Sequence, residues 1–389
     1  MFSAPHFPPG SRVVAAMSGG VDSSVAAWML RESGFEVLGL FMRNGVKVDQ
    51  AEAHKKSCCS LTDARDARMV SAFLGLPFQA VDLSGEFGGL IEHFISEYQR
   101  GRTPNPCAIC NRDLKMGRLL DFADDLGAVA VATGHYARLE VLDGRVHLSR
   151  GVDTHKDQSY QLFSVPEPQL ARTLFPLGHL QKPKVREMAS QAGLRTSHKA
   201  DSQEVCFVPS NDYRELLAER GVALHPGSIV DSQGKKVGTH EGTEHFTVGQ
   251  RRGLRVASGR PLYVLELLPE EGLVIIGDRE ECKATTMIVD DLNWIGIDPE
   301  AEFEVLVQHR YHCTPAPAIV RVDGNRASVE FKQPEMSVTP GQGAAFYWGD
   351  RLLGGGWIES TTRLGIPDSR PTTGAALGTG DPESSGSQG

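Results

Sequence analysis

Short apolar runs alternate with segments of helical period in the first half of the chain. The runs that have the length and composition of buried strands are 12–16, 36–42, 78–83 and 128–135. After the first run, Val25, Trp28 and Met29 lie on one helical face, and the segment ends at Gly34, a residue type common just past a helix C-terminus. Strand–helix alternation of this kind predicts an α/β fold with a doubly wound parallel sheet, whose ligands collect at the carboxyl ends of the strands.

After about residue 210 the pattern changes to short strands separated by Gly, Asp-Gly or Asn turns. This pattern predicts hairpins at 227–242, 260–277, 317–331 and 343–359. The last segment has almost no apolar residues, as is typical of disordered chain. The predicted organisation is an α/β domain at 1–210, a small β-rich central domain at 211–278, a C-terminal β-barrel domain at 279–361 and a disordered tail at 362–389.

Composition narrows the class of protein. The 389 residues are 40% hydrophobic and 23% charged, and no apolar run approaches the roughly 20 residues that span a bilayer. The seven cysteines are an odd number in a long chain, which argues against a secreted disulfide scaffold. We therefore expect a cytoplasmic protein with reduced thiols and no membrane partner. The net charge of −9 argues against a nucleic-acid partner, but the basic runs 182–186, 234–236 and 250–260 leave room for a local basic face.

The stretch "AAMSGGVDSS" at 15–24 follows a predicted strand and opens a predicted helix. Its two glycines let the backbone approach an anion, its serines supply hydroxyl groups, and the helix N-terminus adds unpaired N–H groups. It lacks the Lys-Ser/Thr ending of a Walker A loop. Asp22 beside phosphates makes sense mainly as a group that helps to hold Mg²⁺. The alternative is a glycine-rich turn without a ligand.

The same stretch resembles the PP-loop of the N-type ATP pyrophosphatases, which cleave ATP between its α and β phosphates to adenylate a carbonyl oxygen. Further motifs distinguish among the members of that superfamily. They are "GRTPNPCAICN" (101–111), "ATGHYAR" (132–138), "KDQSYQL" (156–162), "DSQEVCF" (201–207) and "TVGQRRGL" (247–254). Their order is similar to that in the tRNA-specific 2-thiouridylases (the MnmA/TrmU family), and the resemblance runs from about residue 11 to about residue 359. It implies an ATP-dependent tRNA-uridine 2-sulfurtransferase that converts the C2 carbonyl of the wobble uridine to a thiocarbonyl.

The resemblance also implies roles for two cysteines. Cys206 would carry the sulfur as a persulfide, and Cys110 would be the nucleophile that resolves it and transiently forms a disulfide with it. The two lie 96 positions apart, so the fold must bring them together. Cys107 stands where some members of the family have an acidic residue, and we assign it no catalytic role. The partners implied are the anticodon stem-loop of tRNA and a sulfur-donor protein such as a cysteine desulfurase or a relay protein.

The resemblance implies two further sets of residues. The ATP-binding residues would be Ala16, Met17, Ser18, Gly19, Gly20, Val21, Asp22, Ser23, Met42 and Gly134, with Mg²⁺ bound together with ATP. The tRNA-binding residues would be Asn105, Pro106, Cys107, His135, Lys156, Asp157, Gln158, Arg310, Tyr311 and Gln342. For Met42 the alternative is core packing, for His135 a hydrogen-bonded structural role, and for Gln342 an ordinary turn.

Other interpretations of the cysteines stay open. A Cys-x-x-Cys pair is half of a zinc site, but the second half usually repeats the spacing and no such repeat is present, so we expect no resident metal. The remaining cysteines, Cys58, Cys59, Cys282 and Cys313, are expected to be packing or surface thiols. Two rival functions remain: a PP-loop ligase or amidotransferase that acts on another carbonyl without a cysteine pair, and an RNA-binding protein with a structural zinc element.

Overall fold

The structure is a computed structural model that describes residues 2, 6–45, 61–201, 205–208 and 212–366. Cys58 and Cys59 lie outside these residues, as does most of the predicted tail, from 367 onward. The last described strand ends at Arg363.

A parallel sheet of five strands forms the centre of the N-terminal half, in the order β3-β2-β1-β4-β7. Its strands are β1 (Arg12–Ala16), β2 (Glu36–Arg43), β3 (Phe78–Asp82), β4 (Ala130–Ala132) and β7 (Thr173–Leu174). The first four confirm the strands predicted from the apolar runs, but β3 was expected to be buried and, as an edge strand, buries only Val81. Because the chain runs outward from β1 to β2 and β3 and then returns to β4 on the other side of β1, the strand order reverses between β1 and β4. In open α/β sheets such a reversal opens a crevice at the carboxyl ends of the strands.

Helices cover both faces of this sheet. One face packs on α1 (Val21–Glu32), α2 (Leu61–Phe73) and α7 (Lys182–Gln191). The other face packs on α3 (Ser84–Gln99) and α5 (Leu119–Asp125). Successive side chains of β1 point to opposite faces of the sheet, so Val13 belongs to the core on the first face and Val14 to the core on the second. The doubly wound arrangement is therefore as predicted.

A small four-stranded sheet follows in the chain, in the order β10-β11-β8-β9. Its elements are the preceding helix α8 (Tyr213–Glu219) and the strands β8 (Gly227–Asp231), β9 (Lys236–His240), β10 (Tyr263–Leu268) and β11 (Leu273–Gly277). The β8–β9 and β10–β11 pairs are the predicted hairpins, and the parallel β8–β11 pairing joins them.

The C-terminal strands close into an antiparallel barrel. They are β12 (Lys283–Trp294), β13 (Glu302–Gln308), β14 (Ala316–Asp323), β15 (Arg326–Met336), β16 (Gly343–Trp348) and β17 (Arg351–Arg363). Pairing of β12 with β17 closes the ring. The predicted fold class, a parallel α/β sheet followed by two β-rich parts of which the last is a barrel, is confirmed.

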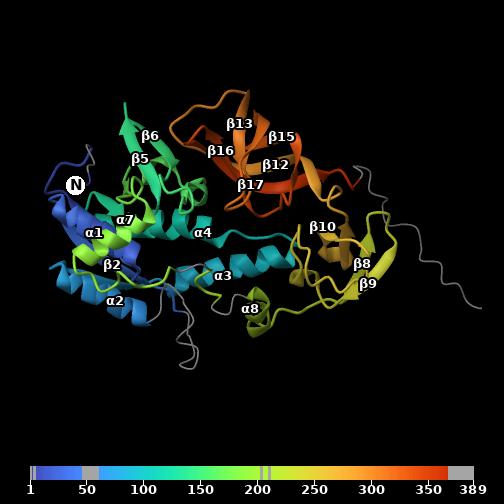
Figure 1. The fold of residues 1–389 in the computed structure, drawn as a ribbon, viewed down its shortest axis with the longest axis horizontal. Helices are drawn as coiled ribbons and strands as arrows, with labels where there is room; N and C mark the ends of the chain where they lie inside the picture. The colour runs from blue at the N-terminus through green and yellow to red at the C-terminus, as the bar shows by residue number, and fades with distance from the viewer. Residues whose placement is uncertain (1, 3–5, 46–60, 202–204, 209–211, 367–389) are drawn as a thin grey trace, which may run out of the picture.

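One hairpin from the N-terminal half extends the barrel sheet. It consists of β5 (Ala137–Leu142) and β6 (Arg145–Arg150), and β6 pairs with β17. In Figure 1 this green hairpin rises from the α/β part and stands beside the barrel. The short helices η3 (Ser159–Leu162) and α6 (Glu167–Leu170) follow it in the chain, and η4 (Thr243–His245) and η5 (Pro269–Glu271) lie in the small sheet's connections.

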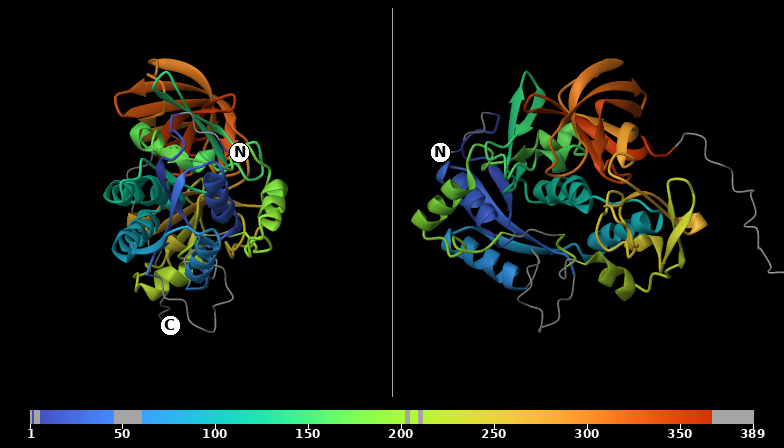
Figure 2. Two further views of the ribbon diagram at one scale, coloured as in Figure 1. Left: turned by 90° about the vertical axis from the view of Figure 1, so that its left-hand side faces the viewer. Right: turned by 45° about the vertical axis from the view of Figure 1, so that its right-hand side comes forward.

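The three parts form an elongated molecule in which the barrel lies above α3 and α4 (Pro106–Ile109), between the α/β part and the small sheet. The two further views of Figure 2 show the same arrangement. No helix in the described ranges is long and apolar enough to cross a membrane.

We predict that the hairpin's attachment to the barrel contributes to stability. Leu148 of β6 is fully buried opposite Leu352 of β17, whereas Leu142 of β5 is 49% exposed. Leu148→Ala should lower the free energy of unfolding by about 2–5 kcal/mol because it leaves a cavity, and Leu142→Ala by less than about 0.5 kcal/mol. Urea unfolding followed by tryptophan fluorescence measures both; equal effects of the two substitutions would contradict the packing described.

Candidate active site

The loop between β1 and α1 lies at the crevice where the strand order reverses. Gly19 has a φ of +71°, and a Cβ atom there would lie 2.3 Å from the carbonyl oxygen of Asp63, so only glycine fits. The backbone N–H of Ser18 donates to Ser23 Oγ at 3.1 Å, which curls the loop over the helix start. Gly20 is the N-cap of α1 and no side chain caps the helix, so the first-turn N–H groups face outward as potential anion donors.

Gly134, which follows β4 across the crevice, touches the same helix start. A Cβ atom at this position would lie 2.9 Å from the backbone nitrogen of Ser23 and 3.0 Å from Cβ of Asp22. Any side chain there would push α1 away from β4. Gly134 therefore has a packing reason to be glycine, in addition to its predicted place beside the adenine.

Asp22 is at the centre of an ion cluster that the sequence did not reveal. Its carboxylate accepts hydrogen bonds from Lys182 Nζ at 2.7 and 2.8 Å and from the hydroxyl of Tyr136 at 2.7 Å. Lys182 is also 2.9 Å from Asp201, which pairs with Lys156 at 2.8 Å as well. Burial by itself would raise the pKa of Asp201, but hydrogen bonds from Lys156 and Lys182 hold it at about 2. Asp201 therefore stays ionised and binds both lysines beside the loop.

A second cation lies on the other side of the loop. Lys199 Nζ donates to the carbonyl oxygen of Gly19 at 2.9 Å and to Asp63 and Asp66 at 2.6 and 2.8 Å. Although burial opposes its charge, the two carboxylates raise the pKa of Lys199. Lys182 and Lys199 thus place two ammonium groups beside the loop that leads into the N-terminus of α1.

The motif "NPCAICN" starts a helix. Asn105 is the N-cap of α4, its Oδ1 accepts from the N–H of Ala108 at 3.2 Å, and Pro106 occupies the first turn, where its missing N–H costs nothing. Cys107 is exposed at this helix start. Cys110 is buried and begins a π-helical stretch, η2 (Cys110–Arg118), that leads into α5. π-helical turns are rare and occur often at functional sites.

Both predicted catalytic cysteines contact one apolar cluster. This cluster, here called the lower core, fills the space between the parallel sheet and α3 and α5. Cys110 belongs to it, and Cys206, Ala16 and Met42 pack against it as partly buried side chains. The fold therefore brings the two cysteines to the same side of the sheet as two of the predicted ATP-binding residues. Met17, in contrast, belongs to the core on the other face.

Several of the predicted tRNA-binding side chains are engaged inside the protein. His135 is 6% exposed and its Nδ1 is 2.7 Å from Thr133 Oγ1. Asp157 is buried and accepts from Arg150, from the N–H of Gly151 and from Ser159. The roles that their contacts show are structural.

Three other predicted tRNA-binding side chains also make protein contacts. Gln158 Oε1 accepts from the N–H of Tyr136 at 3.1 Å. Lys156 is only partly exposed and is held by Asp201. Gln342 Nε2 donates to the carbonyl oxygens of Thr103 and Pro104 at 3.0 and 2.9 Å.

Arg310 and Tyr311 lie in the loop after β13, where Tyr311 is half-buried against the cluster that contains Tyr160. Arg310 is exposed, and the Tyr311 ring lies 6.1 Å from that of Tyr160 in a stacked orientation. Burial, then Asp157 and Cys107, raise the pKa of Tyr311 to about 12. This places Tyr311 near Cys107, so the barrel contributes to the surface around the cysteine motif.

Comparison with known proteins identifies the family. The family model described as "tRNA methyl transferase HUP domain" matches residues 11–210, and the models for a "tRNA methyl transferase PRC-barrel domain" and an "Aminomethyltransferase beta-barrel domain" match 214–278 and 284–358. The tRNA-specific 2-thiouridylase MnmA of Geobacter metallireducens is 49% identical over 361 residues, which cover 91% of this chain and 98% of that protein. The chain belongs to the tRNA-specific 2-thiouridylase family.

Two further members are similar over the same range. The protein of that name from Geotalea uraniireducens is 49% identical over 90% of this chain and 95% of its own length, and that from Heliobacterium modesticaldum is 47% identical over 92% and 95%. The family resemblance noted from the motifs is thus confirmed over nearly the whole chain.

The residues that sequence reasoning missed are Lys182, Lys199 and Asp201. The run 182–186 was expected to contribute to a basic surface, but Lys182 is buried and Arg186 binds Asp201 and the carbonyl oxygens of Ser197 and Lys199. The only available signal was that these charged residues flank a predicted site. Within the described residues, no group of three or more His, Cys, Asp and Glu side chains is arranged to hold a metal ion.

We predict that His135 destabilises the protein in acid. Burial, and to a smaller extent the positive charge of Lys115, lowers the pKa of His135 well below its ordinary value. The folded protein therefore holds the ring neutral, while the unfolded chain protonates it near pH 6.5. Stability through this group is lost as the pH falls below about 6.5, by about 1 kcal/mol at pH 5.5. Urea unfolding at pH 7.5 and 5.5 should show a smaller acid loss for His135→Asn than for the wild type; an equal loss would contradict the buried neutral ring.

Proposed function

We propose that this protein is an ATP-dependent tRNA-uridine 2-sulfurtransferase that thiolates C2 of the wobble uridine. The observation that carries the proposal is the lower core, where Cys110 and Cys206 meet Ala16 and Met42 beside the phosphate loop. Membership of the 2-thiouridylase family supports the same reaction. We place it in the cytosol, where thiols stay reduced.

ATP would bind with its phosphates at the start of α1. The uncapped N–H groups of that turn and the exposed Ser18 supply donors. Lys182 and Lys199 supply positive charge from both sides of the loop. Asp22, one carboxylate in a partly exposed position, fits a Mg²⁺ ion that is held mainly by phosphate oxygens. Bound there, the ion would neutralise phosphate charge.

The cysteine chemistry follows from the need for a sulfur nucleophile. After ATP has adenylated the uridine C2 oxygen with release of pyrophosphate, the Cys110 thiolate would attack the inner sulfur of a Cys206 persulfide. The S–S bond of the persulfide breaks, its outer sulfur leaves as hydrosulfide, and a Cys110–Cys206 disulfide forms. The hydrosulfide adds to C2, and AMP departs with the former carbonyl oxygen. A sulfur-donor protein would reload Cys206 after a thiol reductant has opened the disulfide.

The β-rich parts would hold the RNA. Arg251, Arg252 and Arg255 are exposed in the small sheet's long connection, and Arg310 is exposed on the barrel near Tyr311. Guanidinium groups bind phosphates, and an aromatic ring stacks on an unpaired base. We therefore propose that the α/β part at 1–210 carries out the chemistry, while the parts at 211–278 and 279–361 bind the anticodon stem-loop. Asn105, Pro106 and Cys107 would face the flipped uridine.

The word methyl transferase in the description of the family models suggests a different group transfer. The buried cysteine beside an ATP-type phosphate loop favours sulfur transfer, because a methyl donor needs neither. A PP-loop ligase that uses ammonia would keep the phosphate loop but would not depend on Cys110 or Cys206.

We predict that both cysteines are required with a protein sulfur donor. Purified protein with an unmodified glutamate, glutamine or lysine tRNA, ATP, Mg²⁺ and a persulfide-loaded cysteine desulfurase should yield thiolated tRNA, seen as a retarded band on a mercury-containing gel. Cys206→Ser and Cys110→Ser should each lower the rate at least about a hundredfold, because each removes a bond-forming sulfur. Cys282→Ala, which lies away from the lower core, is the control. Full thiolation by both serine variants would contradict the persulfide mechanism, whereas no thiolation by the wild type would favour the ligase alternative.

We also predict that Lys182 contributes to ATP binding. Lys182→Met removes an ammonium from the Asp22 carboxylate and should weaken ATP binding at least about tenfold, because an unmatched carboxylate then faces the phosphates. Lys184→Met is the matched control, since Lys184 is exposed and pairs only with Glu187 in the described contacts. Isothermal titration with ATP and Mg²⁺ measures both, and equal affinities for the two variants would contradict this role.

A further inference from the structure

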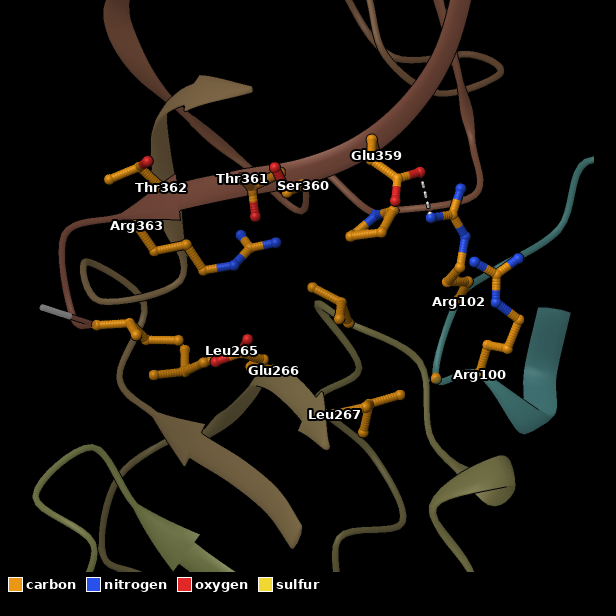
Figure 3. Close-up of a pocket in the computed structure, with 14 residues that line it drawn as sticks. Arg100, Arg102, Leu265, Glu266, Leu267, Glu359, Ser360, Thr361, Thr362 and Arg363 are labelled. Atoms are coloured by element: carbon orange, nitrogen blue, oxygen red, sulfur yellow. Dashed lines mark hydrogen bonds and ion pairs between the residues drawn. The ribbon is translucent and has the colours of Figure 1, made fainter. Parts of the chain in front are cut away.

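The segment that precedes the cysteine motif passes through the junction of the three parts of the molecule. A cavity of about 370 Å³ lies there, between the end of α3, strand β10 and strand β17. Figure 3 shows Arg100 and Arg102 on one wall, Glu359 and Arg363 above and Leu265, Glu266 and Leu267 below. Because this junction is hollow and partly lined with charged groups, polar contacts contribute to the connection between its walls.

Arg102 makes the contacts that cross the junction. Its Nε donates to Glu97 Oε2 at 2.7 Å, and its Nη1 donates to Glu359 Oε2 at 2.6 Å. Its Nη2 lies 3.4 Å from the carbonyl oxygen of Ile358. The Arg102 side chain is 13% exposed and that of Glu97 is 6% exposed, so this ion pair is largely shielded from water. One guanidinium thus joins α3 to β17 of the barrel.

The residues after Arg102 are bound to the barrel through their backbone. The N–H of Thr103 donates to the carbonyl oxygen of Pro340 at 2.8 Å, and Gln342 donates to the carbonyl oxygens of Thr103 and Pro104. Gly341, with a φ of +88°, comes so close that a Cβ atom there would lie 2.8 Å from the Thr103 oxygen. Three backbone groups that lead into the Asn105 cap, the N–H of Thr103 and the carbonyl oxygens of Thr103 and Pro104, are therefore bound by residues more than 230 positions away in the chain.

We infer that Arg102 is a positioning residue that fixes the Cys107–Cys110 segment against the barrel. Its guanidinium fork satisfies two carboxylates at once, a geometry that the single ammonium of lysine does not reproduce. When the fork is removed, the buried carboxylate of Glu97 keeps only the mostly exposed Arg100 as its partner, and the start of α4 loses its anchor to β17. The inference deepens the proposed function, on which its kinetic consequence rests; its structural consequence is independent of that function.

Arg100 provides a matched control. It is two residues earlier and pairs with the same Glu97, at 2.9 Å, but its side chain is 61% exposed and it makes no described contact with the barrel. Figure 3 shows the two arginines side by side, with the dashed contact to Glu359 drawn only from Arg102. Arg100→Ala therefore removes the same charge from the same segment and leaves the connection to β17 intact.

The structural test measures how fast Cys110 reacts with iodoacetamide in the reduced protein, by peptide mass spectrometry in a Cys107→Ser background. Cys110 is 8% exposed, so it reacts only when the segment opens locally. Arg102→Ala and Arg102→Lys should each raise its alkylation rate at least about tenfold over Arg100→Ala. Cys282, fully buried at the base of the barrel, is the internal reference and should stay protected in all variants.

A higher alkylation rate at Cys110 alone supports the inference. Glu359→Gln should reproduce part of that increase, because the amide keeps a hydrogen-bond acceptor for Arg102 but loses the charge. Equal rates at Cys110 in the Arg102 and Arg100 variants would overturn it. A parallel rise at Cys282, whose carbonyl oxygen binds Arg363 on the cavity wall, would also overturn it, because the arginine would then act on the whole junction and not on the cysteine segment.

The kinetic test, under the thiolation conditions above, separates this inference from the proposed function. With Arg102→Ala the kcat should fall at least about tenfold while the KM for ATP stays within about twofold, because the phosphate loop is untouched. Unchanged kcat with a raised Cys110 alkylation rate would overturn the catalytic part of the inference. An absence of thiolation by the wild type would overturn the proposed function and leave the alkylation result valid.

Discussion

Burial of one face of the parallel sheet under α3 and α5 is the interaction on which the site depends. It is a hydrophobic contact without directional chemistry, yet it decides where both cysteines lie. Cys110 is buried because the helix that carries it supplies side chains such as Leu114 and Leu119 to the lower core. Cys206 reaches the same core because the next residue, Phe207, packs against Phe94 of α3 with the rings 5.2 Å apart. The hydrophobic effect thus joins two motifs that are far apart in the sequence.

Electrostatics then determines what the site accepts. The loop after β1 offers outward N–H groups, and two lysines are held at its sides by carboxylates. Those carboxylates orient the two lysines beside the loop. The arrangement is costly in isolation, since Lys182 and Asp201 are mostly shielded from water. Its persistence makes sense if a polyanion shares the lysines during turnover.

The barrel helps to position the cysteine segment of the candidate site. It closes on itself, accepts the β5–β6 hairpin from the α/β part and holds the backbone before α4. Gln342 was expected to contact tRNA. Its amide donates instead to the carbonyl oxygens of Thr103 and Pro104, so the contact with the cysteine segment is its clearest role. Binding of RNA on the barrel face near Arg310 would therefore act on a body that also positions Cys110.

Local pattern was sufficient for much of the fold. Apolar runs predicted β1, β2 and β4 because a strand buried on both faces has few polar residues, and Gly-containing turns predicted the hairpins of the β-rich parts. The β5–β6 hairpin was not predicted, nor was the sheet that it joins, because alternation specifies a buried face and not its partner. The Asp22–Lys182 contact spans 160 positions, and nothing near either residue indicates the other. The π-helical start at Cys110 was also invisible, because it depends on the packing of η2 and not on propensity.

The most direct test of the account is whether the fold places Cys110 and Cys206 within bonding reach. Cys107→Ser protein, reduced and then treated with a mild dithiol oxidant, should give a cross-linked peptide that joins Cys110 to Cys206 within one molecule, as peptide mass mapping would show. The account predicts that the cross-link forms when the folded protein is oxidised and does not form when the protein is oxidised in urea. If both cysteines stay unlinked while the protein remains folded, the two motifs do not form one site and the proposed sulfur transfer is contradicted.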